Sequence, residues 1–241
     1  MNKELAPLGA LHQERRINVI VNNLSNAQTV GFKKDVPVFQ DIFFHEQELL
    51  RNQKMEATRT DFSQGEMVRT GNDLDLAITG DGFFKVSTPN GVRYSRAGNF
   101  RVDPQGRLVN ASGLAVLGQN GDIILDGKKK ISVGTDGTVQ ALGAENNSTP
   151  ETVGKIALVR FADLSALKKE GHTLFRNDGT QGEMEDVEAE IQQGLLETSN
   201  VNAVGEMAQM LEAYRTFETC MKIIQSDDEL TGKTVNEVGR V

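Results

Sequence analysis

Residues 207–224 read MAQMLEAYRTFETCMKII, and their large side chains recur in alternating steps of three and four. The members of this apolar seam are Met207, Met210, Tyr214, Phe217, Met221 and Ile224. Such spacing is the a/d pattern of a coiled coil. Asn202 is a suitable N-cap before the seam and Gly232 a suitable stop after it, so roughly thirty residues of helix are predicted.

A second amphipathic helix is predicted near the other end of the chain, over residues 7–28. Its apolar positions include Leu8, Leu11, Ile17, Ile20 and Leu24. Asn18, Asn22 and Asn26 form a stripe at intervals of four on the same helix. Because a buried amide can fix helix register and partner choice, we predict that part of this stripe faces other helices. A solvated stripe on a weak helix is the alternative.

Between these helices, residues 70–185 have the pattern of short strands separated by tight turns. Leu74, Leu76 and Ile78 alternate with polar or small residues, and many Gly-containing turns follow. The turn candidates are Gly80-Asp81-Gly82, Asn90-Gly91, Asp103-Pro104-Gln105-Gly106, Asn120-Gly121, Asp126-Gly127 and Asp136-Gly137. A compact, mostly antiparallel β domain is therefore predicted.

The order of these segments indicates an α+β fold in which the β domain is an insertion. We expect the N- and C-terminal helices to form a coiled-coil-like stem, with the mostly antiparallel β domain inserted between them. The predicted domains are a helical assembly stem (1–30 plus 200–241), a connecting region (31–69 plus 186–199) and a β-rich outer domain (70–185).

The apolar faces of the two helices predict contacts with other subunits. Two helices alone hide little apolar surface, and isolated helices are marginal in water, so neighbouring subunits are expected to supply the missing faces. A helical hairpin packed on the β domain of the same chain is the alternative. The predicted subunit-contact residues are Leu8, Leu11, Ile17, Ile20, Asn22, Leu24, Asn26, Met207, Met210, Tyr214, Phe217, Met221 and Ile224.

Composition excludes several classes of function. The formal net charge of −8 weighs against nucleic acid as a partner, because phosphate binding needs a concentrated basic surface. No stretch reaches the apolar length of a membrane helix, and the N-terminus lacks an apolar stretch of secretory length. The single cysteine, Cys220, excludes an intramolecular disulfide.

The residue pattern also predicts no catalytic, cofactor-binding or metal site. His12, His45 and His172 are far apart and lack the spacing of metal ligands. Asp73 and Asp75 alternate with apolar residues, which favours the outward face of a strand over a calcium loop. An enzyme would need a cluster of ionisable groups in a pocket, and the sequence displays none.

Four motifs carry a resemblance to a known family. They are NNLSNA (22–27) with TVGFK (29–33); TGNDLDLAI (70–78) with GDGFF (80–84); YSRAGNF (94–100) with Asp103, Gly106 and Leu108; and Gly194 with ETSNVN (197–202). In order and spacing they cover nearly the whole chain, which resembles the flagellar basal-body rod proteins. Within that family the chain is most similar to a proximal rod member, with a distal rod member next and a hook subunit more distant.

The resemblance implies a structural subunit of the rod, the axial drive shaft for motility. Terminal helices would form the inner wall of a tube and the β domain its outside. The implied partners are copies of the chain, adjacent rod proteins and the flagellar type III export apparatus. The implied location is the basal body, in the rod that spans the periplasm, reached without a cleaved signal peptide. The competing hypothesis from another class is a secreted β-domain binding module whose helices are only a stalk.

Overall fold

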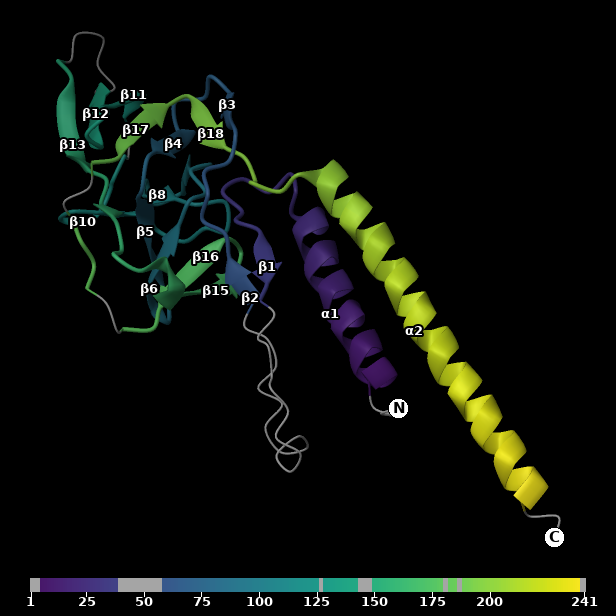
Figure 1. Ribbon diagram of the computed structural model, residues 1–241. Helices are drawn as coiled ribbons and strands as arrows, with labels where there is room; N and C mark the ends of the chain where they lie inside the picture. Colours follow the sequence, from purple (N-terminus) through teal and green to yellow (C-terminus); the bar gives the residue numbers. More distant parts are fainter. Residues whose placement is uncertain are drawn as a thin grey trace. The chain divides into compact units, whose positions relative to one another are not determined.

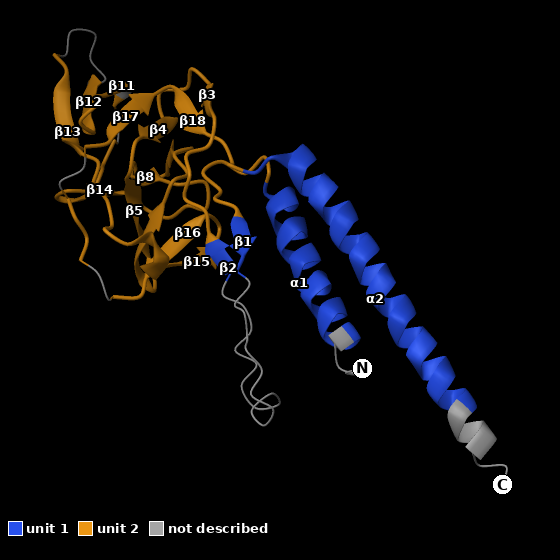
Figure 2. Cartoon of the chain, viewed as in Figure 1, with its two compact units in different colours: residues 1–26, 35–59, 201–241 blue, residues 27–34, 60–200 orange. Residues whose placement is uncertain are grey.

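The computed structural model describes residues 5–38, 58–125, 128–142, 149–179, 182–185 and 188–238. Helix α1 (Leu5–Ser25) precedes a long run of short strands, and helix α2 (Ala203–Val238) follows it (Figure 1). The chain divides into two compact units, shown in Figure 2. Unit 1 comprises residues 1–26, 35–59 and 201–241, and unit 2 comprises residues 27–34 and 60–200.

In unit 1 the two helices lie side by side and antiparallel. A Cβ atom on Gly9 would lie 3.3 Å from Cys220 Sγ, Arg16 forms an ion pair of 3.7 Å with Glu212, and Asn23 reaches Glu206. Residue numbers on α1 therefore rise as those on α2 fall. By this register the first residue of α1 lies opposite the region of Ile224, and residues 225–233 of α2 are all exposed.

The ends of α2 agree only in part with the sequence prediction. Asn202 caps the helix as expected, since its Oδ1 accepts a hydrogen bond of 3.1 Å from the Gly205 N–H. The predicted stop at Gly232 is wrong, because α2 continues to Val238. A single glycine costs a helix only about 1 kcal/mol relative to alanine, which does not force the helix to end.

The prediction of an α+β chain with helical ends agrees with the structure, but the predicted coiled-coil-like stem is wrong. The helices have unequal lengths, 21 and 36 residues. The side of α2 that is covered carries Glu206, Met210, Ala213, Phe217, Cys220 and Ile224. Half of the predicted seam lies outside this contact: Met207, Tyr214 and Met221 are 48%, 60% and 37% exposed. Gly9 and buried Ala213 permit close approach of the helices, and the contact takes up only the other half of the seam.

Unit 2 is built from antiparallel strands, as the turn pattern predicts. Its largest sheet has the order β14 (Leu158–Val159), β5 (Phe83–Thr88), β6 (Gly91–Ser95), β16 (Leu174–Asn177), β15 (Leu167–Gly171). A second sheet has the order β11 (Lys129–Val133), β12 (Thr138–Leu142), β13 (Glu151–Lys155). The two-stranded pairs are β4 (Leu76–Thr79) with β17 (Glu190–Gln193), β3 (Met67–Arg69) with β18 (Leu195–Glu197), β7 (Arg101–Val102) with β8 (Leu108–Val109), and β9 (Leu117–Gly118) with β10 (Gly121–Asp122).

Two further strands and one short helix complete the secondary structure. Strands β1 (Asp35–Pro37) and β2 (Thr58–Thr60) form a two-stranded sheet, and a 3-10 helix, Leu164–Ala166, precedes β15. At the Asn90-Gly91 turn, Thr88 pairs with Gly91 and Gly91 has a φ of 100°. A positive φ at this position suits glycine, which explains why the hairpin turns there.

Unit 2 has two hydrophobic clusters, and β5 contributes to both. Neighbouring side chains on a strand point to opposite faces, so Phe84 packs in the first cluster and Phe83 in the second. The first cluster contains Leu76, Ile78, Phe84, Phe100, Leu108, Val116, Ile123, Leu125, Val133, Val139, Ile156 and Ile191. The second contains Phe83, Tyr94, Val159, Phe161, Leu167 and Phe175. Burial of these two clusters is the main force holding unit 2 together.

Candidate assembly interface

The structure divides the predicted subunit-contact residues between covered and exposed positions. On α1, Ile20 is buried and Asn22 is exposed, while the remaining four predicted α1 positions are half-buried: Leu8, Leu11, Ile17 and Leu24. Asn26, just beyond α1, is also half-buried. On α2, Met210, Phe217 and Ile224 are half-buried, and Met207, Tyr214 and Met221 are exposed. The contact between α1 and α2 therefore accounts for only part of the apolar surface that the sequence displays.

Most of the exposed large apolar side chains of α2 form a stripe of their own, with Ile223 and Leu230 outside it. This outer stripe consists of Val204, Met207, Leu211, Tyr214 and Met221, spaced by three, four, three and seven residues. Val204 is 78% exposed and Leu211 is 59% exposed. Contiguous apolar surface of this kind marks interaction sites on soluble proteins. Neither α1 nor any other described segment of unit 1 covers the stripe.

Among the asparagines near the end of α1, the buried one is Asn23, which is not among the predicted contact residues. Asn18 and Asn22 are exposed, but Asn23 is buried. Its Nδ2 donates to Asp35 O at 2.8 Å and its Oδ1 accepts from the Asp35 N–H at 2.9 Å. Its Nδ2 also lies 3.4 Å from Glu206 Oε2. Asn23 lies three residues after buried Ile20, which is the spacing that could have identified it.

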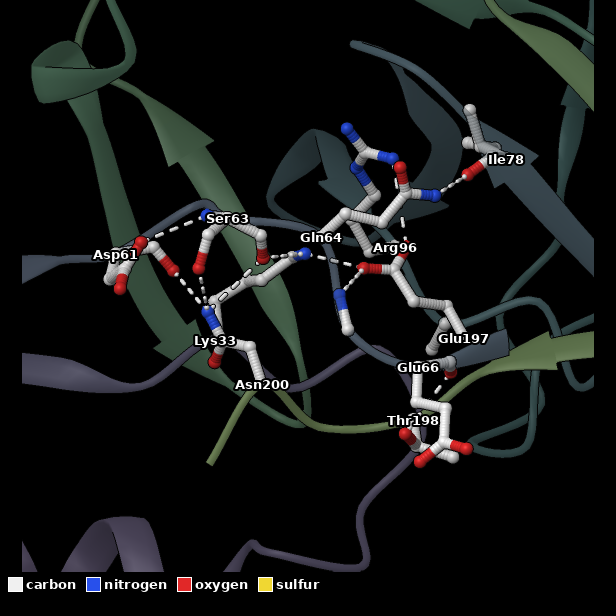
Figure 3. A network of polar contacts seen from close by, with 12 residues as sticks. Lys33, Asp61, Ser63, Gln64, Glu66, Ile78, Arg96, Glu197, Thr198 and Asn200 are labelled. Atoms are coloured by element: carbon white, nitrogen blue, oxygen red, sulfur yellow. Dashed lines mark hydrogen bonds and ion pairs between the residues drawn. The ribbon is translucent and has the colours of Figure 1, made fainter. Parts of the chain in front are cut away.

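Unit 2 contains a buried polar junction, formed by Lys33, Arg96 and Glu197 (Figure 3). Lys33 and Glu197 are fully buried, and Lys33 Nζ lies 2.5 Å from Glu197 Oε1. Glu197 Oε1 also accepts the Gly65 N–H at 2.9 Å, and Lys33 Nζ donates to Ser63 O at 2.7 Å. The junction thus joins segments far apart in the sequence.

The junction places two cations against one carboxylate. Arg96 Nη1 lies 3.6 Å from Glu197 Oε2, and neither atom has a hydrogen-bond partner within the protein. Arg96 Nη2 instead donates to Gly80 O at 2.8 Å, and its guanidinium lies over the Phe83 ring. Burial lowers the pKa of the Lys33 ammonium, while the Glu197 carboxylate opposes that shift. Glu197 is therefore the carboxylate that faces both buried cations, and its removal would leave them without it.

Two glycines allow the backbone to approach closely around the junction. Gly31 has a φ of 67°, and a Cβ atom there would lie 2.3 Å from Ala97 N. At Gly65 a Cβ atom would lie 2.0 Å from Thr198 O. Both distances are too short for any side chain, so a substitution requires the backbone to move. All four sequence motifs supply residues here: the first contains Gly31 and Lys33, the second Gly80 and Phe83, the third Arg96 and the fourth Glu197.

The described residues show no metal site, and their helices do not have membrane-spanning character. Among them, no three His, Cys, Asp or Glu side chains gather as metal ligands would. Within the same ranges, no helix combines the length and apolarity needed to cross a membrane.

Comparison with known protein families assigns the chain to a class. The family described as flagellar hook protein FlgE/F/G D1 domain matches residues 77–141. The family described as flagellar basal body rod FlgEFG protein C-terminal matches residues 192–237. These matches lie in the β unit and at α2, and together they define the class of flagellar hook and rod proteins.

Individual relatives show to which family within this class the chain belongs. A flagellar basal-body rod protein FlgF of Caulobacter vibrioides is 35% identical, over 94% of this chain and 93% of the relative. FlgG of Bacillus subtilis is 33% identical over 95% of both chains, and FlgF of Escherichia coli is 32% identical over 89% of both. The chain belongs to the flagellar basal-body rod protein family, and it is a structural subunit of the rod.

The comparisons also bear on the finer prediction within the family. The order of the first two identities agrees with the prediction that the chain is most like FlgF, with FlgG next. Neither matching family model describes a catalytic activity. Membership of the family implies assembly with other rod components.

Proposed function

We propose that the chain polymerises through its terminal helices, with the outer stripe of α2 buried against helices of neighbouring subunits. The observation that carries the proposal is the exposure of Met207 and Tyr214, at 48% and 60%, on an apolar stripe that α1 leaves uncovered. Burial of apolar surface contributes about 25 cal/mol per Å², so such a stripe favours association. Three methionines lie among the predicted α2 contacts, and their flexible side chains suit neighbours of slightly different shape.

The same proposal gives a role to four further predicted contacts. Asn22 is exposed on α1 and its amide is available to helices of other subunits. Met210, Phe217 and Ile224 pack within unit 1 and act indirectly, by holding α2 in place. The proposed partners are copies of this chain and adjacent rod proteins. Residues 1–30 with 200–241 form the assembly region, residues 31–69 with 186–199 connect it, and residues 70–185 form the outer part.

The proposed role is mechanical rather than enzymatic. The chain passes through the flagellar export apparatus without a cleaved signal peptide and takes its place in the rod that crosses the periplasm. Such a subunit travels unfolded and forms its helix contacts at the end of the growing rod. The outer stripe is uncovered in the single chain because neighbouring subunits cover it there. The names of the relatives support the location at the basal body.

The test compares charged substitutions on and off the outer stripe. Met207→Asp and Tyr214→Asp each place a carboxylate where the proposal buries apolar surface, at a cost of roughly 3 kcal/mol or more per contact. Gln209→Asp and Thr216→Asp, at exposed positions of the same helix outside the stripe, are the matched controls. Swimming motility and the recovery of rods from cells carrying each variant are measured.

We expect loss of motility and of complete rods in the two stripe variants and near-normal motility in the two controls. Circular dichroism of the purified chains should show the same helix content in all four, because the substituted side chains are exposed in the isolated subunit. Normal motility in both stripe variants would contradict assembly through this face.

A further inference from the structure

The two segments that connect unit 2 to the helices bind one another directly. Residues 31–34 follow α1 after a short link, and residues 197–200 precede α2. The Gly31 N–H donates to Glu197 O at 2.8 Å, and the Lys34 N–H donates to Asn200 Oδ1 at 2.7 Å. The second contact lies three residues after the first on both segments, so the two segments run parallel.

The side chains of the junction reinforce this pairing. Lys33 on one segment binds Glu197 on the other at 2.5 Å, with both side chains fully buried. A third segment supports both: Ser63 O accepts from Lys33 Nζ and from Asn200 Nδ2, at 2.7 and 3.1 Å. Asn200 Nδ2 also donates to Asp61 O at 2.8 Å. Each connecting segment is therefore held twice, once by the other and once by residues 61–63.

The order of the chain gives this pairing a mechanical consequence. Residues 35–196 lie between the two segments in the sequence, so the pairing closes a loop that contains nearly all strands of unit 2. Tension applied through α1 arrives at residues 31–34, and tension applied through α2 arrives at residues 197–200. By either route the tension meets the paired segments before it reaches the strands of unit 2 that lie between them in the sequence.

We propose that residues 31–34 and 197–200, joined through Lys33 and Glu197, form a clamp that carries tension between the terminal helices and shields the strands of unit 2. The clamp goes beyond the proposed function, because it is a property of the single chain and is measured without assembly. Its failure would leave the polymerisation proposal untouched, and the reverse is also true.

The chemistry of the clamp favours resistance to displacement over equilibrium stability. Apolar side chains of similar volume often replace a buried ion pair without loss of stability. Hydrogen bonds between buried polar groups, in contrast, are directional and fix their partners in one arrangement. The close backbone approach of Gly31 to Ala97 and of Gly65 to Thr198 packs each of the two segments tightly against a further part of unit 2.

Single-molecule pulling on the full chain through its two ends tests the clamp. The main variant, Lys33→Met with Arg96→Met and Glu197→Leu, makes the junction apolar without leaving a charge unpaired. Asn200→Ala is a milder variant that removes the acceptor of the Lys34 N–H and disturbs no buried charge. The control, Lys128→Met with Glu151→Leu, removes another Lys–Glu pair of unit 2, at the surface of the three-stranded sheet.

We expect unit 2 of the apolar variant to open at least about tenfold faster at a given force, because forced unfolding is governed by the unfolding rate. Asn200→Ala should change the rate in the same direction, and the control should leave it unchanged. The urea midpoint of the apolar variant should fall only modestly, because the Gly65 N–H and Gly80 O lose their side-chain partners but no charge is left unpaired.

Three results would overturn the clamp. Equal opening rates in the native chain, the apolar variant and Asn200→Ala would remove its mechanical role. Acceleration in the control as large as in the apolar variant would show that any ion pair in unit 2 has the same effect. If the apolar variant does not fold, an unchanged opening rate in Asn200→Ala alone decides against the clamp.

Discussion

At the scale of single residues, Glu197 is the residue on which most of the junction depends. It faces Lys33 at 2.5 Å and Arg96 at 3.6 Å, and it is their shared counter-ion. Losing one of the two cations is less serious than losing Glu197, because an ion pair between Glu197 and the other cation remains. The energetic consequences of substitution are therefore asymmetric.

We predict that Glu197→Gln lowers the free energy of unfolding by about 3–5 kcal/mol, since it leaves two buried cations uncompensated. Lys33→Met should cost less, about 1–2 kcal/mol. After that change Glu197 Oε1 still accepts the Gly65 N–H, and Ser63 O still accepts from Asn200 Nδ2. Urea unfolding of both variants at pH 7 measures the difference, and equal losses would show that Glu197 is not the shared counter-ion.

A second residue-scale prediction concerns acid sensitivity in unit 2. Burial alone would raise the pKa of Glu183, but hydrogen bonds from Lys85 and Tyr94 hold it below its usual value of 4.5. A carboxyl group with a lowered folded-state pKa stabilises the fold above the unfolded pKa, and this contribution is lost as the pH falls through the folded value. The stabilising effect of Glu183 should therefore be complete at pH 7 and decline below 4.5.

The measurement compares the urea midpoints of the native chain and Glu183→Gln at pH 7 and at about pH 3, where the linkage should have diminished. The gap between the two proteins should be smaller at the acid pH. Glu185→Gln, at an exposed position two residues further on, is the control. A gap of constant size at both pH values would rule out the contribution of the ionised carboxylate.

At the scale of secondary-structure elements, Asn23 connects three elements of unit 1. Its side chain pairs with the backbone of Asp35 at the start of β1, much as a neighbouring strand would, and it reaches Glu206 in the first turn of α2. The end of α1 is thereby tied to β1 and to the beginning of α2. Asn22, its neighbour in the sequence, is exposed and has none of these contacts through its side chain.

We expect Asn23→Ala to destabilise unit 1 by about 2 kcal/mol, because it leaves the Asp35 N–H and C=O without their side-chain partner. Asn22→Ala should change stability by less than about 0.5 kcal/mol, as surface substitutions usually do. The loss of helical circular dichroism at 222 nm in urea reports both. Equal effects would mean that the buried amide contributes no more than an exposed one.

At the scale of the whole molecule, the two units differ in how they are stabilised. Unit 2 has two hydrophobic clusters and many paired strands, whereas the helices of unit 1 bury one stripe each. Helices without tertiary packing are marginal in water. Beyond Ile224, residues 225–233 of α2 are exposed and lie past the end of α1 in the register of the pair.

Hydrogen exchange on the purified chain should therefore show three levels of protection. Amides of β5 and β6 should exchange slowest, those of residues 206–224 at an intermediate rate, and those of residues 225–238 fastest. Uniform protection across both units would show that the helices are satisfied within a self-contained monomer or a soluble oligomer. It would also contradict the proposal that the outer stripe is buried only when neighbouring subunits bind.

The sequence by itself determined the helical ends, the antiparallel β middle, the turn at Asn90-Gly91 and the family. These features depend on local signals, namely periodicity, capping residues and turn residues, and on motifs that lie in short stretches. The pattern on α2 also showed that an apolar stripe exists. It could not show which face of α2 is covered. Glu206 and Met207 are adjacent in the sequence, yet packing against α1 buries Glu206 and leaves Met207 exposed.

Only the tertiary structure decided that choice, and it also decided the composition of the junction. Small residues such as Gly9 and Ala213 let α1 approach one side of α2, and the outer stripe was left exposed. Lys33, Arg96 and Glu197 look like ordinary surface charges in the sequence, since charged residues are almost never fully buried unless paired. Folding brings them together across 164 residues of chain, and burial converts them into one site in which each charge depends on the others.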